Sequence, residues 1–277
     1  MQQRRQLYVL SNDAPCGREF GSEHGLSILV ELDRSTRWLW DIGQSDLFLE
    51  SAGTLGLNME TVKGAALSHG HYDHTGGLSA LLGKTGFQGP IYAHPGCGIK
   101  RYKFQPDRRP ESIGLDTEAI PWPPPGYIPV SGVKALDDGL TMISDIPRRP
   151  GLHESVRGYF FDLAGAHPDH VADDACLVLT SENGPVVILG CCHSGLANTL
   201  QHIRDLLGID SIFSVVGGLH LLTASKIRLE EAVDILNTFS VKKVYPCHCT
   251  GKAAIGFLEN RLPGRVFEIG TGTSVAF

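Results

Sequence analysis

Short apolar runs separated by polar turns recur along the 277-residue chain and predict strands. A first strand is expected near residue 10, and others at 26–32, 37–43, 62–68, 89–94, 158–163, 175–181, 185–190, 211–218, 242–247 and 265–270. Apolar residues at helical spacing predict helices at 45–56, 195–208, 225–239 and 253–262, and a short one after Thr75.

Strand-rich segments followed by helices occur twice in this order. Two packed sheets with helices outside them would explain the pattern. A doubly wound Rossmann sheet is the competing arrangement, but it expects a glycine-rich fingerprint after the first strand. The residues there, "SNDAPCGREF", lack that fingerprint.

Residues 100–130 depart from this alternation. They contain seven prolines and little periodicity, which predicts a long ordered loop or lid, with a domain linker as the alternative. We therefore expect one domain over residues 1–277, with a proline-rich lid or insertion at about 100–155.

Composition narrows the classes of partner. Hydrophobic residues make up 42% and charged residues 19%, which is typical of a soluble globular protein. The net charge of −6 argues against a nucleic-acid partner, and the lack of an apolar run of about 18 residues argues against a membrane span. The first residues do not resemble a signal peptide, and the seven cysteines form no disulfide framework, so a cytoplasmic protein is expected.

The stretch "ALSHGHYDHTGG" at 66–77 carries the strongest chemical signal. His69 and His71 are two apart after a predicted strand, so both can face one metal ion. Asp73 continues this register and His74 breaks it, so the second pair can reach another point. Such a loop could serve two ions about 3.5–4 Å apart. A solvated polar loop is the alternative.

Further candidates lie where predicted strands begin or end, the places where a scaffold holds functional residues rigidly. They are Asp41, Asp174, Cys191, His193, His220 and His248.

These motifs together resemble a known family. "SHGHYDHTGG" resembles the signature of the metallo-β-lactamase superfamily, and "WDIGQS" (40–45) is similar to its first motif. "EHGLS" (23–27), "GCCHSG" (190–195), "GGLHL" (217–221) and "HCTG" (248–251) resemble one branch, the dihydropterin-methyl-ribofuranosylaminobenzene-phosphate synthase-like metallo-hydrolases. The resemblance spans nearly the whole chain except 100–155. It implies an α/β (α+β) fold, a four-layer αββα sandwich with two metals at one sheet edge.

The resemblance also implies roles for individual residues. The implied ligands are His69 and His71 for the first metal, and Asp73, His74 and His248 for the second. Asp41 would support the ligand loop through hydrogen bonds.

The middle motifs depart from the common pattern. Cys191 stands where the superfamily has a bridging aspartate, and we favour His193 as the third ligand of the first metal. Asp174 is either a ligand or a supporting carboxylate. Cys191 is either a thiolate ligand or a buried small hydrophobe. His220 is a substrate contact, an extra ligand or a packed structural histidine.

The leading hypothesis is a metal-dependent hydrolase with two divalent ions, zinc first, with manganese or iron also accepted. A metal-activated water would attack an ester, lactone or phosphoester of a small molecule. Asp73 would orient that water, and His220 would donate to the developing oxyanion.

Two other functions stay open. A transferase would join a pterin-like diphosphate to an aminobenzene ribofuranosyl phosphate, with Arg101, Lys103 and Arg148 as phosphate contacts unless these only form a solvated loop. Trp122 and Tyr127 would then stack on a flat substrate or else cover the core. A non-catalytic, metal-dependent binding protein is the third hypothesis. A homodimer is the default expectation for the oligomeric state.

Overall fold

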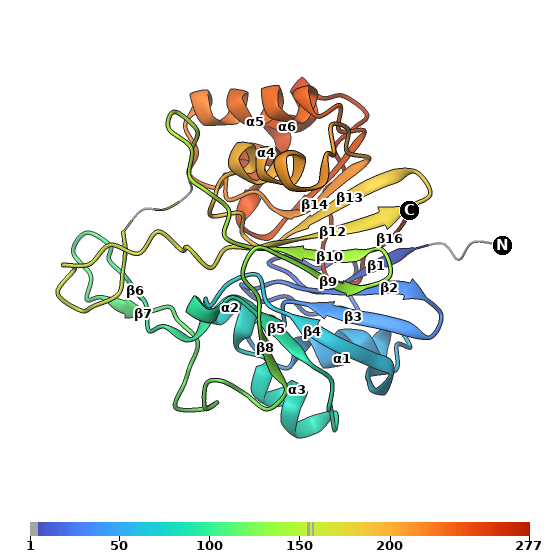
Figure 1. The fold of residues 1–277 in the computed structure, drawn as a ribbon, viewed down its shortest axis with the longest axis vertical. Coiled ribbons are helices and arrows are strands. Elements are labelled where there is room, and N and C mark those ends of the chain that lie inside the picture. The colour runs from blue at the N-terminus through green and yellow to red at the C-terminus, as the bar shows by residue number, and fades with distance from the viewer. Residues whose placement is uncertain (1–4, 154–155, 157) are drawn as a thin grey trace.

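Two β-sheets lie face to face at the centre of the molecule (Figure 1). The computed structural model describes residues 5–153, 156 and 158–277. The first sheet contains β1 (Gln6–Ser11), β2 (Ser27–Asp33), β3 (Thr36–Trp40), β4 (Val62–Ala66), β5 (Ile91–Ala93), β8 (Tyr127–Pro129) and β16 (Ser274–Ala276). The second contains β9 (Val133–Asp137), β10 (Leu140–Ile143), β12 (Cys176–Ser181), β13 (Gly184–Leu189), β14 (Ser214–Gly218) and β15 (Lys243–Cys247).

The order of strands brings several strand ends together. The first sheet runs β16-β1-β2-β3-β4-β5-β8, and the second runs β15-β14-β13-β12-β10-β9. Strands β3, β4, β5 and β8 are parallel to one another, as are β13, β14 and β15. Because parallel strands end at the same edge of a sheet, the loops after them gather there.

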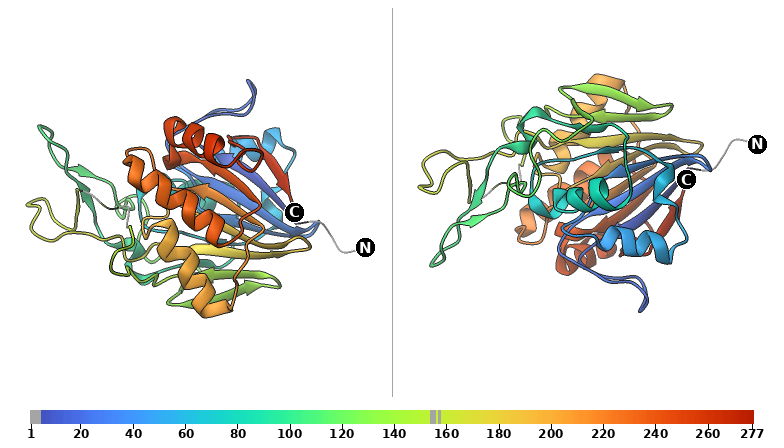
Figure 2. Two further views of the ribbon diagram at one scale, coloured as in Figure 1. Left: turned by 90° about the horizontal axis from the view of Figure 1, so that it is seen from above. Right: turned by 90° about the horizontal axis from the view of Figure 1, so that it is seen from below.

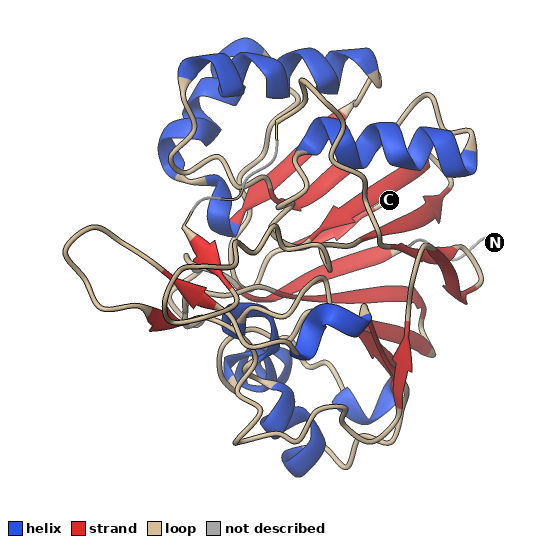
Figure 3. Ribbon diagram, turned by 60° about the vertical axis from the view of Figure 1, so that its left-hand side comes forward, coloured by secondary structure: helices blue, strands red, loops and turns tan. Residues whose placement is uncertain are grey.

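Helices cover the outer faces of both sheets (Figures 2 and 3). Next to the first sheet lie α1 (Leu47–Thr54), α2 (Tyr72–Thr75) and α3 (Leu78–Lys84). The second sheet is covered by α4 (Leu196–Leu207), α5 (Lys226–Thr238) and α6 (Lys252–Arg261). The described residues also form three short 3₁₀ helices: η1 (Met59–Thr61), η2 (Pro95–Gly98) and η3 (His248–Thr250).

The strands are apolar on both faces because each face is buried against a different layer. In β2, Ile28 and Val30 join the apolar cluster between the sheets, while Leu29 joins the cluster with α1 and α3. In β13, Ile188 faces the other sheet and Leu189 packs toward α4 to α6. Neighbouring residues of a strand point to opposite faces, which explains this alternation. The resulting order, helix–sheet–sheet–helix, confirms the predicted four-layer fold.

The segment expected to be a lid or insertion does not lie wholly outside the two main sheets. Strands β8, β9 and β10 lie within residues 100–155 but belong to the two main sheets. The projecting part is a small sheet of β6 (Tyr102–Lys103), β7 (Glu111–Ser112) and β11 (Tyr159–Phe160), ordered β11-β6-β7 (Figure 1). Residues 154, 155 and 157 of this region lie outside the described part of the chain.

Two other details differ from the sequence-based expectation. Residues 265–270 form no strand; they make one bridge, Val244 to Val266, and the edge strand beside β1 is β16 instead. Helix α1 begins after Asp46, although the Ser45 hydroxyl still accepts a hydrogen bond from Leu47 N at 3.1 Å. Within the described residues, no helix is long and apolar enough to span a membrane.

Candidate metal centre

Polar side chains from both sheets meet at the edge where the parallel strands end. Each follows a strand of the core: Asp41 follows β3, His69 follows β4, Cys191 and His193 follow β13, His220 follows β14, and His248 follows β15. Asp41, His220 and His248 have left-handed backbone angles, with φ of 55°, 49° and 50°. Asp and His adopt this region more readily than most residues. The sharp turn that each makes aims its side chain back toward the common edge.

Four groups of possible metal-ligating atoms occur among the described residues, and two of them, which share Cys191, contain most of the predicted ligands. Asp73, His74, Cys191 and His248 each offer a ligand atom within 4.8 Å of the others. His69, Cys191 and His193 form a second such group. All of these side chains are buried. The arrangement therefore offers two neighbouring places for a cation.

His71 lies against the second of these groups. Its Nδ1 is 2.9 Å from His69 Nε2, and its ring centroid is 5.0 Å from that of His193. Tyr159 packs edge-on against His71, with ring centroids 5.2 Å apart. The sequence thus placed His69, His71 and His193 in one set, and the structure brings them together.

The carboxylate of Asp41 supports the segment between β4 and α3 that carries four candidate ligands. The carboxylate accepts hydrogen bonds from Ser68 N and Ser68 Oγ, both at 2.7 Å, and lies 2.7 Å from His74 Nδ1. This contact fixes the His74 ring so that Nε2 points to Cys191 Sγ at 3.2 Å. A carboxylate behind a ligating histidine raises the basicity of the ring and fixes its tautomer.

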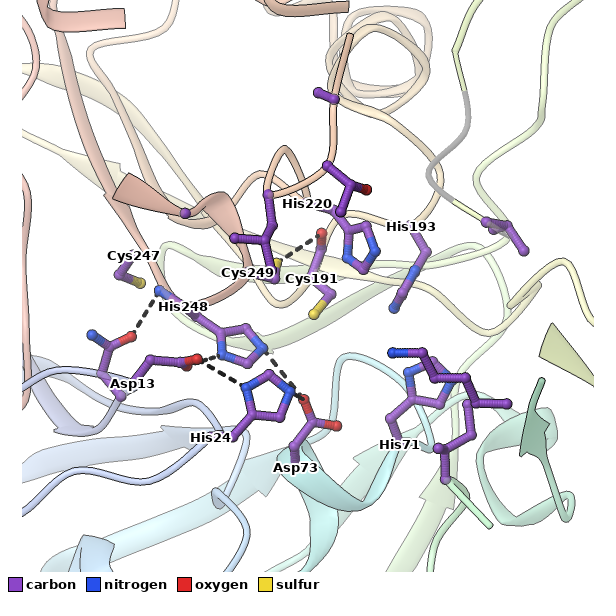
Figure 4. Close-up of a pocket in the computed structure, with 18 of the residues that line it drawn as sticks. Asp13, His24, His71, Asp73, Cys191, His193, His220, Cys247, His248 and Cys249 are labelled. Atoms are coloured by element: carbon purple, nitrogen blue, oxygen red, sulfur yellow. Dashed lines mark hydrogen bonds and ion pairs between the residues drawn. The ribbon is translucent and has the colours of Figure 1, made fainter. Parts of the chain in front are cut away.

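Asp13 and His24 were not predicted as site residues. Asp13 contacts His248 Nδ1 at 2.6 Å and His24 Nδ1 at 2.9 Å, and His24 Nε2 lies 3.5 Å from Asp73 (Figure 4). These residues lie in an irregular segment that has no periodic signal. His24 does fall within the "EHGLS" motif, which was the only sequence signal for it.

Arg101 and Arg148 do not face the substrate side, contrary to expectation. Arg101 is 1% exposed, donates to Asp173 at 2.7 Å and pairs with Asp169. Asp173 in turn accepts a hydrogen bond from Gly70 N at 2.8 Å. The buried pair of Arg101 and Asp173 therefore stabilises the loop that carries His69 and His71. Arg148 donates to backbone carbonyls, including Val171 O at 2.8 Å.

Asp174 supports the other ligand loop. Its carboxylate accepts from Ser194 N at 2.7 Å, directly after His193. It belongs to none of the ligand groups found among the described residues. Its hydrogen bond to Ser194 N fits the role of a supporting carboxylate.

The pKa values of three candidate ligands suit metal binding, whereas for His248 burial lowers the pKa but Cys249 and Asp13 outweigh it and raise that pKa well above its usual value. Burial, followed by the nearby Arg101 charge, lowers the pKa of His71 to about 3. Burial and the neighbouring histidines also lower the pKa of His69 well below its usual value. Burial alone would raise the pKa of Asp73, but His74 and His248 outweigh it and hold that pKa well below the usual range. At neutral pH the two histidines are neutral and the aspartate is ionised, as ligands must be.

A fit to metal is also visible in buried atoms that lack partners. Among the described residues, His71 Nε2 and His220 Nδ1 are buried without a hydrogen-bond partner. Such atoms cost free energy unless something satisfies them. A cation at this edge would satisfy the His71 nitrogen.

The centre opens into a cavity of about 900 Å³. Tyr159 and Lys103 reach it from the small projecting sheet, and His220, Arg228 and Lys252 line the opposite side. Lys103 is thus the one expected phosphate contact that faces the cavity.

The aromatic residue beside the metal ligands differs from those that the sequence suggested. Trp122 and Tyr127 pack on each other, 5.0 Å apart, and against the core beside α3, away from the cavity. Tyr159 lines the cavity instead.

Comparisons with known proteins show which proteins this chain resembles. A family profile described as the metallo-beta-lactamase superfamily matches residues 25–193. The 7,8-dihydropterin-6-methyl-4-(beta-D-ribofuranosyl)-aminobenzene-5'-phosphate synthase of Methanocaldococcus jannaschii is 27% identical over 268 residues, which cover 91% of this chain and 90% of that protein.

Solved structures resemble this chain as well. Tm1679, described as a metal-dependent hydrolase of the beta-lactamase superfamily, is 29% identical, with a TM-score of 0.84 over 98% of both chains. Zn(2+)-bound PqqB from Methylobacterium extorquens shares the fold, with a TM-score of 0.58, 13% identity, and coverage of 98% and 99%.

Proposed function

The chain belongs to the metallo-β-lactamase superfamily, and from this premise we propose that it is a metal-dependent hydrolase with two divalent ions, most simply zinc. The observation that carries the proposal is the pair of buried ligand groups at one sheet edge, opening into a cavity. His69, His71 and His193 would hold one ion. Asp73, His74 and His248 would hold the other.

When bound, the ions would lower the pKa of water toward about 7 and polarise the scissile bond. The protein supplies position and charge. Asp73 lies 3.6 Å from His74 Nε2 and 3.4 Å from His248 Nε2, where its ionised carboxylate can orient a water molecule. His220 lines the cavity, and its ring lies 4.4 Å from that of His193, so it can donate to a developing oxyanion.

The cavity favours a small molecule that carries an anionic group. Lys103, Arg228 and Lys252 line its wall and can contact a phosphate or carboxylate, although Arg228 also pairs with Glu231 and Lys252 with Glu268. A volume of about 900 Å³ suits a ligand of drug-like size. Esters, lactones and phosphoesters within this size are the proposed substrates.

The test combines metal analysis with turnover. Natively purified protein should contain two divalent ions per chain and hydrolyse a member of an ester, lactone and phosphodiester panel. His71→Ala should remove that activity together with metal. Protein that holds no metal after native purification would contradict the proposed centre, and a metal-loaded protein without turnover would support a binding role.

A transferase is the second candidate, because the M. jannaschii relative is named a synthase. The same cations could draw off a diphosphate leaving group while the basic residues of the cavity hold a phosphate. The discriminating assay offers a pterin diphosphate together with an aminobenzene ribofuranosyl phosphate. Release of pyrophosphate that depends on both compounds, with no turnover of the hydrolysis panel, would establish the transferase.

A further inference from the structure

Cys191 occupies the centre of the candidate site. Its sulfur is shared by three groups of ligand atoms: the group of Asp73, the group of His69, and a third group formed with His220 and Cys249. Figure 4 shows the sulfur directed into the space between His248 and His193. No other described residue belongs to all three groups.

Cys191 does not lie among apolar side chains, as a buried small hydrophobe would. The side chain is 3% exposed, and its sulfur lies 3.2 Å from His74 Nε2. A buried small hydrophobe is expected to pack against other apolar groups. The next residue does so: Cys192 joins the apolar cluster under α4 to α6. The two adjacent cysteines therefore point into chemically different places.

The local backbone holds Cys191 close to the ligand loop. A side chain at Gly190 would meet Ser68 Oγ at 2.2 Å and Asp41 Oδ2 at 3.1 Å. Only glycine lets the strand end approach the loop that carries His69 and His74 so closely. Cys191 is thus placed between the two groups of ligands that come from opposite sheets.

We propose that the thiolate of Cys191 bridges the two metal ions, so that the centre is joined by sulfur. This inference rests on the proposed function, because it needs the two-ion centre. It extends that proposal by assigning the shared ligand and the class of metal. Thiolates select thiophilic ions such as zinc, iron and cobalt over magnesium and manganese.

Cys249 is the other cysteine of the centre that could supply a metal-binding thiolate. Its Sγ approaches the backbone carbonyl of Cys191 at 3.6 Å and belongs only to the group with His220. It is not grouped with Asp73, His74 or His69, so its sulfur shares no group with the proposed histidine and aspartate ligands of either ion. Any sulfur signal that depends on Cys249 alone would contradict the bridge.

Cobalt substitution tests the assignment without relying on activity. Thiolate ligation gives Co(II) a charge-transfer absorption in the near ultraviolet, and two Co(II) per chain should show it. Cys191→Ser and Cys191→Asp should lose this absorption, and the aspartate variant should keep two ions through its carboxylate. Cys192→Ser is the matched control, and it should keep the full absorption.

Each result decides between the proposals. Loss of the absorption in both Cys191 variants, but not in Cys192→Ser or Cys249→Ser, would support the bridge. Two bound ions with no such absorption in the unaltered protein would overturn the bridge and leave the proposed function standing. Absence of bound cobalt, zinc and manganese alike would overturn the proposed function itself.

Discussion

Asp41 joins two parts of the candidate centre through one carboxylate. It accepts hydrogen bonds from Ser68 and lies 2.7 Å from His74 Nδ1. In Asp41→Asn, one oxygen becomes an amide that cannot accept, so His74 loses its orienting partner or Ser68 does. We expect metal affinity to fall by about 10–100-fold, the usual cost of losing such a partner. Competition with a chelator measures it.

Asp33→Asn is the matched control for that change. Asp33 also follows the core of a strand and accepts hydrogen bonds from the next turn, here from Ser35 at 2.7 Å. It is the last residue of β2 and belongs to none of the ligand groups. The Asp33→Asn variant should bind metal with the same affinity as the unaltered protein. An equal effect in both variants would mean that Asp41 acts through general stability.

His220 can be separated from the metal ligands by one substitution. Asparagine tolerates the left-handed backbone of this position, where φ is 49°. His220→Asn should keep both ions but lower kcat by about 10²–10³-fold, the typical cost of losing an oxyanion donor. Metal content and kcat measured on the same sample test this. Loss of an ion would make His220 a ligand instead.

At the scale of single residues, the sequence pointed to the candidate ligands and to Asp41 behind them, but not to the more distant partners. His69, His71, Asp73 and His74 are close in sequence, so spacing alone predicts a shared site. Asp13 reaches His248 from 235 positions away, and Arg101 reaches Asp173 through the fold. Such pairings depend on how distant segments pack, and no local pattern encodes them. The two basic residues Arg101 and Arg148 were misjudged for this reason.

At the scale of elements, the loop after β4 is held so tightly that one methyl group should disturb it. A Cβ at Gly70 would lie 1.9 Å from the backbone oxygen of Cys97. Because backbone must shift, Gly70→Ala should destabilise the protein by about 1–3 kcal/mol and reduce metal content. Gly83→Ala in α3 is the control, since its Cβ meets nothing within 4 Å. It should stabilise by about 1 kcal/mol or less.

Chemical denaturation of the two variants measures both effects. The pair differs only in whether the added methyl has room. Equal stability of Gly70→Ala and the unaltered protein would contradict the tight packing of this loop.

Elements with strong local patterns were predicted well, and short edge strands were not. Strands β12 and β13 and helices α4 and α5 each carry a long apolar pattern, and their limits lie close to those expected. Strand β16 has three residues and exists because it pairs with β1 from the far end of the chain. Residues 265–270 look like a strand, yet only Val266 makes a bridge. Pairing of distant partners, rather than propensity, decided these cases.

At the scale of the whole molecule, the candidate centre joins the two sheets. His69 lies in the loop after β4 and His74 in α2, both beside the first sheet, while His193 and His248 follow β13 and β15 in the second. The sheets also share an apolar cluster that includes Trp38 and Leu177. Since the histidines of an unfolded chain are not held together, metal ions bind the folded state in preference.

Bound metal should therefore stabilise the whole fold, not one loop. At a free metal concentration 100 times its dissociation constant, one site adds about 2.7 kcal/mol to the free energy of unfolding. Thermal melting with zinc and with excess chelator should show a single transition that moves up by several degrees with zinc. His248→Ala, which removes a ligand on the second sheet only, should shrink this shift. A metal-dependent change confined to an early partial transition would show that the ions order one loop and do not tie the sheets.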